Sequence, residues 1–341
     1  MKILITGGSG FVGSNIAIYL KKNLKNAKIY SLDNLSRRGS IINKRRLSNY
    51  KIKNYKLNIE NFKSTISLPK FNLVIDCCAE PAIEISEKNP DKVFNTNLVG
   101  TYNILKKCLK DKSNIIFLSS SRVYSIEKLK KIVKTNKINK PIKVKKEINE
   151  NFDTSAASSL YGFTKLASEK LIKEIFFKSD LKYIINRFGV IAGPWQFGKQ
   201  DQGFVPLWVA RHYLKKKLSY IGFGGNGHQI RDILHINDVC EIIMLQIKSL
   251  KKINNKIFNI GGGKINAISL MDLTLKCEKL TKNKIKISKI SKTSKFDIPY
   301  YVSANKKISK FYKWKPSKDI DNILNDIYSW LIEFKNVRKF F

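Results

Sequence analysis

The chain has 341 residues, of which 43% are hydrophobic and 11% aromatic, so it can bury a substantial core and is not a disordered protein. Its formal net charge of +39 comes from lysines spread along the whole chain, whereas a dedicated nucleic-acid binder concentrates its basic residues on one face or element. No apolar run approaches the ~18 residues of a membrane span, and glycine follows the first apolar stretch too early for a signal peptide, so we expect a soluble cytoplasmic protein with no nucleic-acid or membrane partner.

Strand and helix signals alternate through the first half of the chain. Short apolar or β-branched runs predict strands, and apolar residues at helical spacing predict the helices between them. In chain order the predicted elements are a strand at Lys2–Thr6, a helix at Gly13–Lys22, strands at Lys28–Leu32 and Leu73–Cys78, a helix at Asn95–Leu109, a strand at Asn114–Ser119, a helix at Tyr161–Lys178 and a strand at Tyr183–Arg187. This alternation predicts an α/β fold of the Rossmann type, with a doubly wound parallel sheet.

The second half of the chain is less regular. Residues 127–151 are rich in lysine and lack apolar periodicity, which predicts a surface excursion. Beyond Arg187, turn-rich stretches surround a predicted helix at Leu207–Lys215, and apolar spacing from Ile320 to Leu331 predicts a closing amphipathic helix. We therefore expect a sheet domain at residues 1–186 with a return segment near 233–262, and a smaller interleaved C-terminal domain at 187–232 and 263–341.

Three glycines in TGGSGFVG separate the first strand from the first helix. Gly7, Gly10 and Gly13 would let the chain turn tightly, let a pyrophosphate approach the backbone and let the helix pack on the strand. The N-terminus of the helix would attract the negative charge of the pyrophosphate. The strand before the glycines and the helix after them favour a dinucleotide site over an ordinary glycine turn.

An acidic residue follows at the spacing that such a site requires. Asp33 ends the second strand, 20 residues after Gly13, where its carboxylate would bind the adenosine ribose hydroxyls and repel a 2′-phosphate. This position predicts NAD as the cofactor. Arg37 and Arg38 stand nearby and could weaken the preference for NAD over NADP.

Tyr161 and Lys165 lie four residues apart in SSLYGFTKLASE, a spacing that stacks both side chains on one face of a helix. There the Lys165 ammonium would stabilise a tyrosinate, so that Tyr161 could take a proton from a sugar hydroxyl while hydride leaves the same carbon for nicotinamide. The spacing alone is common on exposed helix faces, but here it follows a glycine loop and a strand that ends in serines. In FLSSSRVYS, Ser120 is the candidate whose hydroxyl would hold the reacting sugar oxygen.

Together these motifs resemble the extended short-chain dehydrogenase/reductase family, the NAD-dependent epimerases and dehydratases, over nearly the whole chain. The matching segments are TGGSGFVG, DNLS after the second strand, a serine shortly before V-Y, Y-x-x-x-K, NLVGT from Asn97 and RDILHIND from Arg231. The resemblance implies that the first domain binds NAD and that the second binds a nucleotide sugar. Members are frequently homo-oligomeric, which implies a dimer or tetramer.

The resemblance also implies individual contacts. Phe11 and Val12 would flank the pyrophosphate, and Asn58 and Ile59 would lie near adenine, although the family usually has Asp at the position of Asn58. The full set of expected cofactor contacts is Gly7, Gly10, Phe11, Val12, Gly13, Asp33, Asn34, Asn58, Ile59, Cys78, Ala79, Asn97, Tyr161, Lys165 and Phe188.

Two arginines are the expected substrate ligands. Arg231 and Arg122 would pair with the diphosphate of the nucleotide sugar, through charge-assisted contacts. For Arg231 the alternative is a structural ion pair with Asp232 or Asp238. We expect no metal site, because the five cysteines form no C-x-x-C pair and the three histidines lack paired ligands.

Two departures from family patterns bear on the reaction. Dehydratases of the family have an Asp-Glu pair directly after the catalytic Ser or Thr, whereas this chain has Ser121-Arg122, so dehydration is not expected. UDP-sugar 4-epimerases typically have Asn at the position of Val190. The segment from Asn186 to His235 instead resembles the CDP-paratose (CDP-tyvelose) 2-epimerases, which implies oxidation at C2 of a CDP-sugar, rotation of the keto sugar and return of hydride to its other face.

Two other hypotheses remain open. The first is a UDP-sugar 4-epimerase or another nucleotide-sugar epimerase. The second is a catalytically idle Rossmann protein that binds nucleic acid through its lysines.

Overall fold

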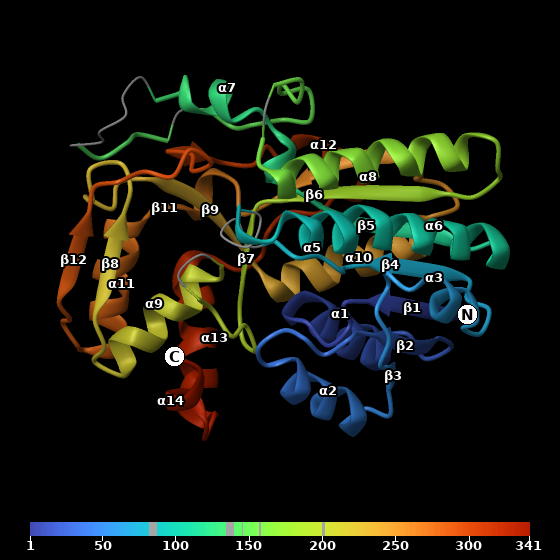
Figure 1. Ribbon diagram of the computed structural model, residues 1–341. Coiled ribbons are helices and arrows are strands. Elements are labelled where there is room, and N and C mark those ends of the chain that lie inside the picture. Colours follow the sequence, from blue (N-terminus) through green and yellow to red (C-terminus); the bar gives the residue numbers. More distant parts are fainter. Residues whose placement is uncertain (82–86, 134–139, 145, 157, 200–201) are drawn as a thin grey trace. The chain divides into compact units, whose positions relative to one another are not determined.

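The computed structural model describes residues 1–81, 87–133, 140–144, 146–156, 158–199 and 202–341. The chain forms two compact units (Figure 1). Unit 1 comprises residues 1–123, 159–187 and 239–258, and unit 2 comprises residues 124–158, 188–238 and 259–341. The sequence analysis counted residues 124–158 with the first domain, whereas the structure groups them with unit 2.

Unit 1 is built on a sheet whose strand order reverses near its middle. In the part of the chain that the structure describes, seven strands form this sheet in the order β10-β6-β5-β4-β1-β2-β3. β1 pairs in parallel with both β2 and β4, so the loops after β1 and β4 flank a switch point, where open α/β sheets bind ligands. The strands are β1 (Lys2–Thr6), β2 (Lys28–Leu32), β3 (Lys53–Tyr55), β4 (Leu73–Asp76), β5 (Asn114–Ser120), β6 (Tyr183–Phe188) and β10 (Lys256–Ile260).

Helices join these strands. α6 packs against α3 and α8, and α1 packs separately against α2. The helices of unit 1 are α1 (Phe11–Asn23), α2 (Ser40–Asn49), α3 (Phe62–Ile66), α5 (Pro90–Phe94), the π-helical segment η1 (Asn95–Val99), α6 (Gly100–Asp111), the short 3₁₀ turn η2 (Ser121–Val123), α8 (Leu160–Phe177) and most of α10 (Ile236–Ser249).

The sequence patterns explain the core of unit 1. Successive residues of β1 are buried, as expected for a strand covered on both faces. Under α6 and α8 the core contains buried residues from strands and helices, among them Leu4, Val74, Ile104, Leu105, Ile115 and Ile172. On α6 the buried positions Ile104, Leu105 and Cys108 share one stripe, whereas Tyr102 and Leu109 are exposed.

Most predicted elements of this half of the chain appear within a few residues of their expected bounds. The strand predicted at Leu73–Cys78 ends earlier, at Asp76, because Cys77 and Cys78 turn away into the loop. The helix predicted from Asn95 begins as a π-helical segment before continuing as α6.

Unit 2 contains a smaller sheet and its own core. β9 pairs with β7, β11 and β13, and β8 pairs with β12. Its strands are β7 (Val190–Ala192), β8 (Leu218–Ile221), β9 (Ile230–His235), β11 (Ala267–Ser269), β12 (Ile287–Ile290) and β13 (Tyr300–Tyr301). Its helices are α7 (Ile126–Lys130), α9 (Phe204–Tyr213), α11 (Leu270–Thr281), α12 (Lys306–Tyr312), α13 (Ile320–Glu333) and α14 (Val337–Phe340), with a short 3₁₀ turn η3 (Lys264–Asn266).

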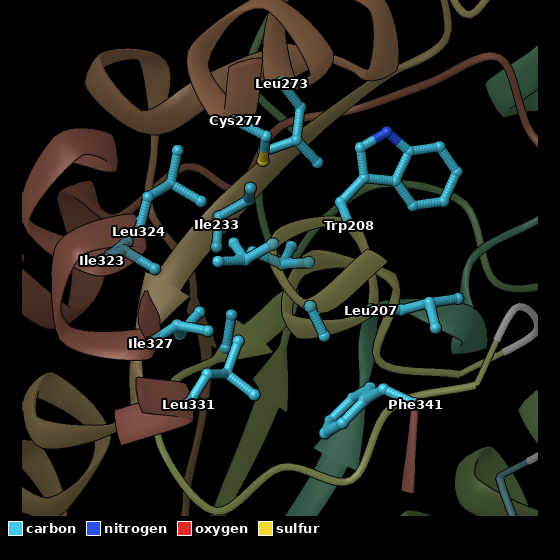
Figure 2. Close-up of a cluster of buried hydrophobic side chains, with 14 of the residues drawn as sticks. Leu207, Trp208, Ile233, Leu273, Cys277, Ile323, Leu324, Ile327, Leu331 and Phe341 are labelled. Carbon is cyan, nitrogen blue, oxygen red and sulfur yellow. The ribbon is translucent and has the colours of Figure 1, made fainter. Parts of the chain in front are cut away.

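The core of unit 2 lies where α9, α11 and α13 pack on one another. The closing helix α13 is amphipathic, as predicted, and buries Ile323, Ile327 and Leu331 against α9 and α11. Figure 2 shows these side chains converging with Leu207 and Trp208, Ile233, and Leu273 and Cys277.

The lysine-rich stretch at residues 127–151 is not simply a surface excursion. Residues 134–139 and 145 lie outside the described residues, but Leu129 and Ile148 are buried. The Ile148 N–H donates to Val302 O at 2.7 Å, and Ala304 N–H donates to Ile148 O at 2.9 Å. The prediction was wrong at these points because pairing with a distant strand leaves no periodic signal in a short segment.

Candidate active site

The glycine loop between β1 and α1 is a tightly packed turn. Gly7 has a φ of 59°, in the left-handed region that glycine adopts without strain. A Cβ at Gly7 would lie 3.0 Å from Cys77 O, in the loop after β4. A Cβ at Gly13 would overlap Gly7 O and lie 2.8 Å from Gly8 Cα. Gly7 therefore makes the turn, and Gly13 allows α1 to pack directly on the loop.

Gly10 differs from the other two glycines because its missing side chain faces open space. Only Gly7 O, at 3.0 Å, would lie within contact distance of a Cβ there. α1 begins at Phe11 without a side-chain cap and, in its described first turn, without an acidic residue. The N–H groups and positive end of the helix thus border a space that a Cβ would fill, which fits the pyrophosphate of a dinucleotide.

Asp33 lies directly after β2 and is 9% exposed. Its carboxylate accepts hydrogen bonds from Ser9 N–H at 3.0 Å and Leu35 N–H at 2.7 Å, so it is held against the glycine loop. Burial raises the pKa of Asp33, and the backbone hydrogen bonds and the charge of Arg37 oppose that rise. The position is where a Rossmann fold holds the adenosine ribose.

Three other predicted cofactor contacts lie around the same end of the sheet. Asn34 is exposed, and its Oδ1 accepts Ser36 N–H at 3.0 Å. Asn58 is also exposed, and its Oδ1 accepts Glu60 N–H at 3.2 Å. Ile59 is buried against Gly100 of α6, where a Cβ would lie 2.5 Å from Ile59 Cδ1. Ile59 is therefore a core residue whose side chain packs in the interior of unit 1.

The loop after β4 is held by a buried amide. Asn97, which is fully buried, accepts Glu80 N–H at 2.7 Å and donates to Glu80 O at 3.2 Å and to Thr164 Oγ1 at 3.2 Å. Its side chain thus ties the loop containing Cys78 and Ala79 to α8. Contact between Asn97 and the cofactor stays a prediction, whereas its clamp on Glu80 was missed because nothing in the local sequence indicates that partner.

Two neighbouring serines at the end of β5 have different partners. Ser119 is buried, and its hydroxyl donates to Glu169 Oε1 at 2.5 Å. Ser120 is half-buried, and its Oγ accepts Arg122 N–H at 3.1 Å. Because Ser119 is engaged in the interior, the choice of Ser120 as the candidate site residue fits the geometry.

Tyr161 and Lys165 lie in the first turns of α8, which packs against β5 and η2. The N-cap Ser159 accepts Gly162 N–H at 3.1 Å and so fixes the start of the helix. Lys165 is 2% exposed, with its Nζ 4.4 Å from the centroid of the Phe117 ring of β5. Tyr161 is half-buried one turn earlier.

The Lys165 charge reaches the loop after β4. Burial raises the pKa of Cys77 and Cys78, the neighbouring Asp76 carboxylate raises it further, and the Lys165 ammonium opposes both effects. The ammonium thus acts electrostatically at the switch point of the sheet, beside the expected cofactor contacts. Unit 1 brings Ser120, Tyr161 and Lys165 together around the end of β5.

A buried ion pair behind these residues was missed by the sequence analysis. Glu169, one turn after Lys165 on α8, pairs with Arg187 of β6 at 2.7 Å, and both side chains are at most 6% exposed. With Ser119, this pair connects α8, β5 and β6 beside the candidate catalytic residues. The only sequence signal is the helical spacing of Glu169 from Tyr161 and Lys165.

The remaining predicted residues lie apart from this group or at its edge. Arg122 belongs to η2, next to Ser120, and Phe188 is 4% exposed at the end of β6. Arg231 lies on β9 in unit 2, where its guanidinium pairs with Asp297 at 3.0 Å and donates to Ile298 O at 2.7 Å. Asp297 is a partner that the sequence analysis did not consider, because it lies far along the chain.

Metal and thiol chemistry have little support in the described part of the chain. No group of three or more His, Cys, Asp or Glu side chains there could hold a metal ion. The five cysteines carry free thiols, and burial raises the pKa of Cys108 to about 12. Among the helices that the structure describes, none combines the length and apolarity needed to cross a bilayer.

Comparison with known proteins agrees with this geometry. Residues 3–261 match the NAD dependent epimerase/dehydratase family. The chain belongs to this family. NAD is therefore its cofactor, as predicted, and the resemblance inferred from the motifs is confirmed.

Individual relatives of this family member differ in their reactions. The chain is 28% identical to CDP-paratose 2-epimerase of Salmonella typhi, over 97% of this chain and 99% of that protein. It is 30% identical to dTDP-D-glucose 4,6-dehydratase of Dictyostelium discoideum, over 76% of this chain and 58% of that protein. The structure resembles the crystal structure of UDP-glucose 4-epimerase with UDP-glucose from Thermotoga maritima, with a TM-score of 0.82 at 24% identity, covering 98% of this chain and 99% of that one. This last likeness confirms the predicted fold class.

Proposed function

We propose that the protein is an NAD-dependent nucleotide-sugar epimerase, and most specifically a CDP-paratose 2-epimerase. The observation that carries the reaction type is the grouping of Ser120, Tyr161 and Lys165 at the end of β5, beside the switch point. The observation that supports the substrate is the likeness to CDP-paratose 2-epimerase along 97% of this chain.

Each of the three residues has a distinct role in this proposal. Tyr161 takes the proton from the sugar hydroxyl at the carbon being oxidised and returns it after the sugar has rotated. Lys165, held over the Phe117 ring, supplies the positive charge that stabilises the tyrosinate. Ser120 Oγ already accepts Arg122 N–H, so its own proton remains to be donated to the sugar oxygen. Bound NAD supplies reversible acceptance of hydride.

The cofactor is held by unit 1 in this proposal. The space beside Gly10 and the N-terminus of α1 receive the pyrophosphate, and Asp33 receives the adenosine ribose. Asn34, Asn58 and Ile59 border the adenosine end, whereas Cys78 and Ala79 border the nicotinamide end. Arg122 and Arg231 pair with the substrate diphosphate, although Arg231 must share its guanidinium with Asp297.

Epimerisation is favoured over dehydration by the residues after Ser120. Elimination of water requires an acid and a base in addition to Tyr161, and Ser121-Arg122 provides neither. An epimerase needs no such groups, because hydride and proton return to the carbon from which they left.

A substrate panel tests the proposal. The full-length protein is mixed separately with CDP-paratose, UDP-glucose and dTDP-glucose, each carrying deuterium at the carbon to be oxidised, and products are identified by NMR. We expect turnover of the CDP-sugar at C2, with the deuterium retained on C2 and transient absorbance of reduced nicotinamide. Inversion at C4 of UDP-glucose would support a UDP-sugar 4-epimerase, which the fold likeness to the Thermotoga maritima enzyme favours and Val190 disfavours. Transfer of the label to C6 of dTDP-glucose would support a dehydratase.

Tyr161→Phe tests the catalytic assignment in the same assay. Loss of the phenol hydroxyl should lower kcat by roughly 10²–10⁴-fold without loss of bound NAD. The matched control is Tyr102→Phe, which removes the hydroxyl of an exposed tyrosine on α6 and should leave kcat unchanged. Equal activity of Tyr161→Phe and the parent would contradict the mechanism and revive the hypothesis of a catalytically idle protein. Assembly as a dimer or tetramer is part of the proposal and is checked by light scattering.

A further inference from the structure

Glu80 is a buried acid whose role neither the motifs nor the proposed chemistry explains. It lies in the loop after β4 and is 3% exposed. Asn97 binds both its N–H and its C=O, so the backbone of Glu80 is held in one position. A carboxylate buried in this way requires positive partners.

Those partners are two cations from other parts of unit 1. Arg37 Nη1 forms an ion pair with Glu80 Oε1, and the Arg37 side chain is 36% exposed. Lys92 Nζ lies 3.7 Å from the other carboxylate oxygen of Glu80, and its side chain is 46% exposed. The closer contact is with Arg37, so Arg37 cannot leave without exposing Glu80 to an uncompensated charge.

Arg37 also lies beside the acid that faces the adenosine ribose. Its charge acts on Asp33, four residues earlier in the same loop. In Rossmann folds an arginine at this place accommodates the 2′-phosphate of NADP, whereas the acid favours the 2′-hydroxyl of NAD. The chain therefore carries both the group that rejects a 2′-phosphate and a group able to bind one.

We propose that Glu80 is a positioning residue for cofactor specificity: by pairing with Arg37 it withholds the guanidinium from a 2′-phosphate and so maintains the preference for NAD over NADP. Asp33 repels the phosphate directly, and Glu80 removes the nearby cation that would offset this repulsion. Asn97 contributes by fixing the Glu80 backbone. The inference rests on the proposed placement of the adenosine ribose beside Asp33 and is independent of the sugar substrate.

The experiment is an equilibrium competition on the full-length protein. Parent and variants are incubated with equal concentrations of NAD⁺ and NADP⁺ at physiological ionic strength, where charges farther apart than roughly 8 Å are screened. The dinucleotide released by denaturation is then quantified by mass spectrometry. In Glu80→Gln the bound NADP/NAD ratio should rise about tenfold, the effect of one charge-assisted hydrogen bond to the 2′-phosphate.

Arginine variants isolate the pair. Arg37→Gln in the parent should leave the ratio unchanged, because Glu80 already withholds the guanidinium. Adding Arg37→Gln to Glu80→Gln should abolish the gain, as a double-mutant cycle requires for direct coupling. A marked fall of NADP binding in Arg37→Gln alone would overturn the inference, and this variant also decides the matter if Glu80→Gln does not fold.

Two controls separate other causes. Glu60→Gln removes a half-buried carboxylate that accepts Thr96 Oγ1 at 2.6 Å, and it should not change the ratio if the effect is specific to Arg37. An equal gain in Glu60→Gln would overturn the inference in favour of a general charge effect. Asp33→Asn should raise the ratio by itself. If it does and Glu80→Gln does not, the role of Glu80 is refuted while the ribose placement stands; if neither does, the placement itself is refuted.

Discussion

The loops after β1 and β4 meet at the switch point of the sheet, and different means hold them in shape. In the loop after β1, glycines allow backbone to approach backbone, as the overlap between a Cβ at Gly13 and Gly7 O makes plain. In the loop after β4, buried side chains fix the backbone, with Asn97 bonded to both polar groups of Glu80. The first loop is therefore sensitive to added atoms, and the second to removed ones.

The comparison also divides the glycines of the first loop. Gly13 is surrounded by backbone, whereas Gly10 has one neighbour and otherwise faces open space. The same substitution should thus act on folding at Gly13 and on cofactor binding at Gly10. Three substitutions test these contrasts.

Gly13→Ala should have the largest effect. Helix propensity alone would stabilise α1 by about 1 kcal/mol, but the new methyl group must displace the backbone of Gly7 and Gly8, which we expect to cost about 3 kcal/mol or more. Urea unfolding of the NAD-free protein measures the free energy of unfolding. An unchanged or higher stability would refute the close packing of α1 on the loop.

Asn97→Ala should come second. Removal of the amide leaves the Glu80 N–H and C=O without their buried partner and loosens the link to Thr164, so the free energy of unfolding should fall by about 2–3 kcal/mol. Asn97→Asp is the matched variant, because it keeps the acceptor for Glu80 N–H and loses only the donors. A smaller loss in Asn97→Ala than in Asn97→Asp would contradict the hydrogen-bond assignment.

Gly10→Ala should have the smallest effect on folding. Alanine is a poorer N-cap than glycine, which should cost less than ~1 kcal/mol of stability. Its methyl group would occupy the space assigned to the pyrophosphate, so the affinity for NAD should fall by roughly 10–100-fold, measured by displacement of bound NADH. Normal affinity in Gly10→Ala would place the pyrophosphate elsewhere.

Local sequence patterns were sufficient for much of unit 1. Strand bounds, the turn at Gly7, the acid at the end of β2 and the one-turn separation of Tyr161 and Lys165 each depend on residues within one element or one short loop. Steric rules and helical or strand periodicity act over that range, so a single sequence reveals them.

Only the tertiary structure decided which distant side chains become partners. It assigned Asn97 to Glu80, Ser119 and Arg187 to Glu169, Arg37 to Glu80 and Arg231 to Asp297. Each pair joins different elements, and burial there removes the competition of water, so the choice depends on which strand ends and helix turns become neighbours. The sequence by itself therefore determined the places where chemistry is expected, and the packing of strands against helices decided how those places are held.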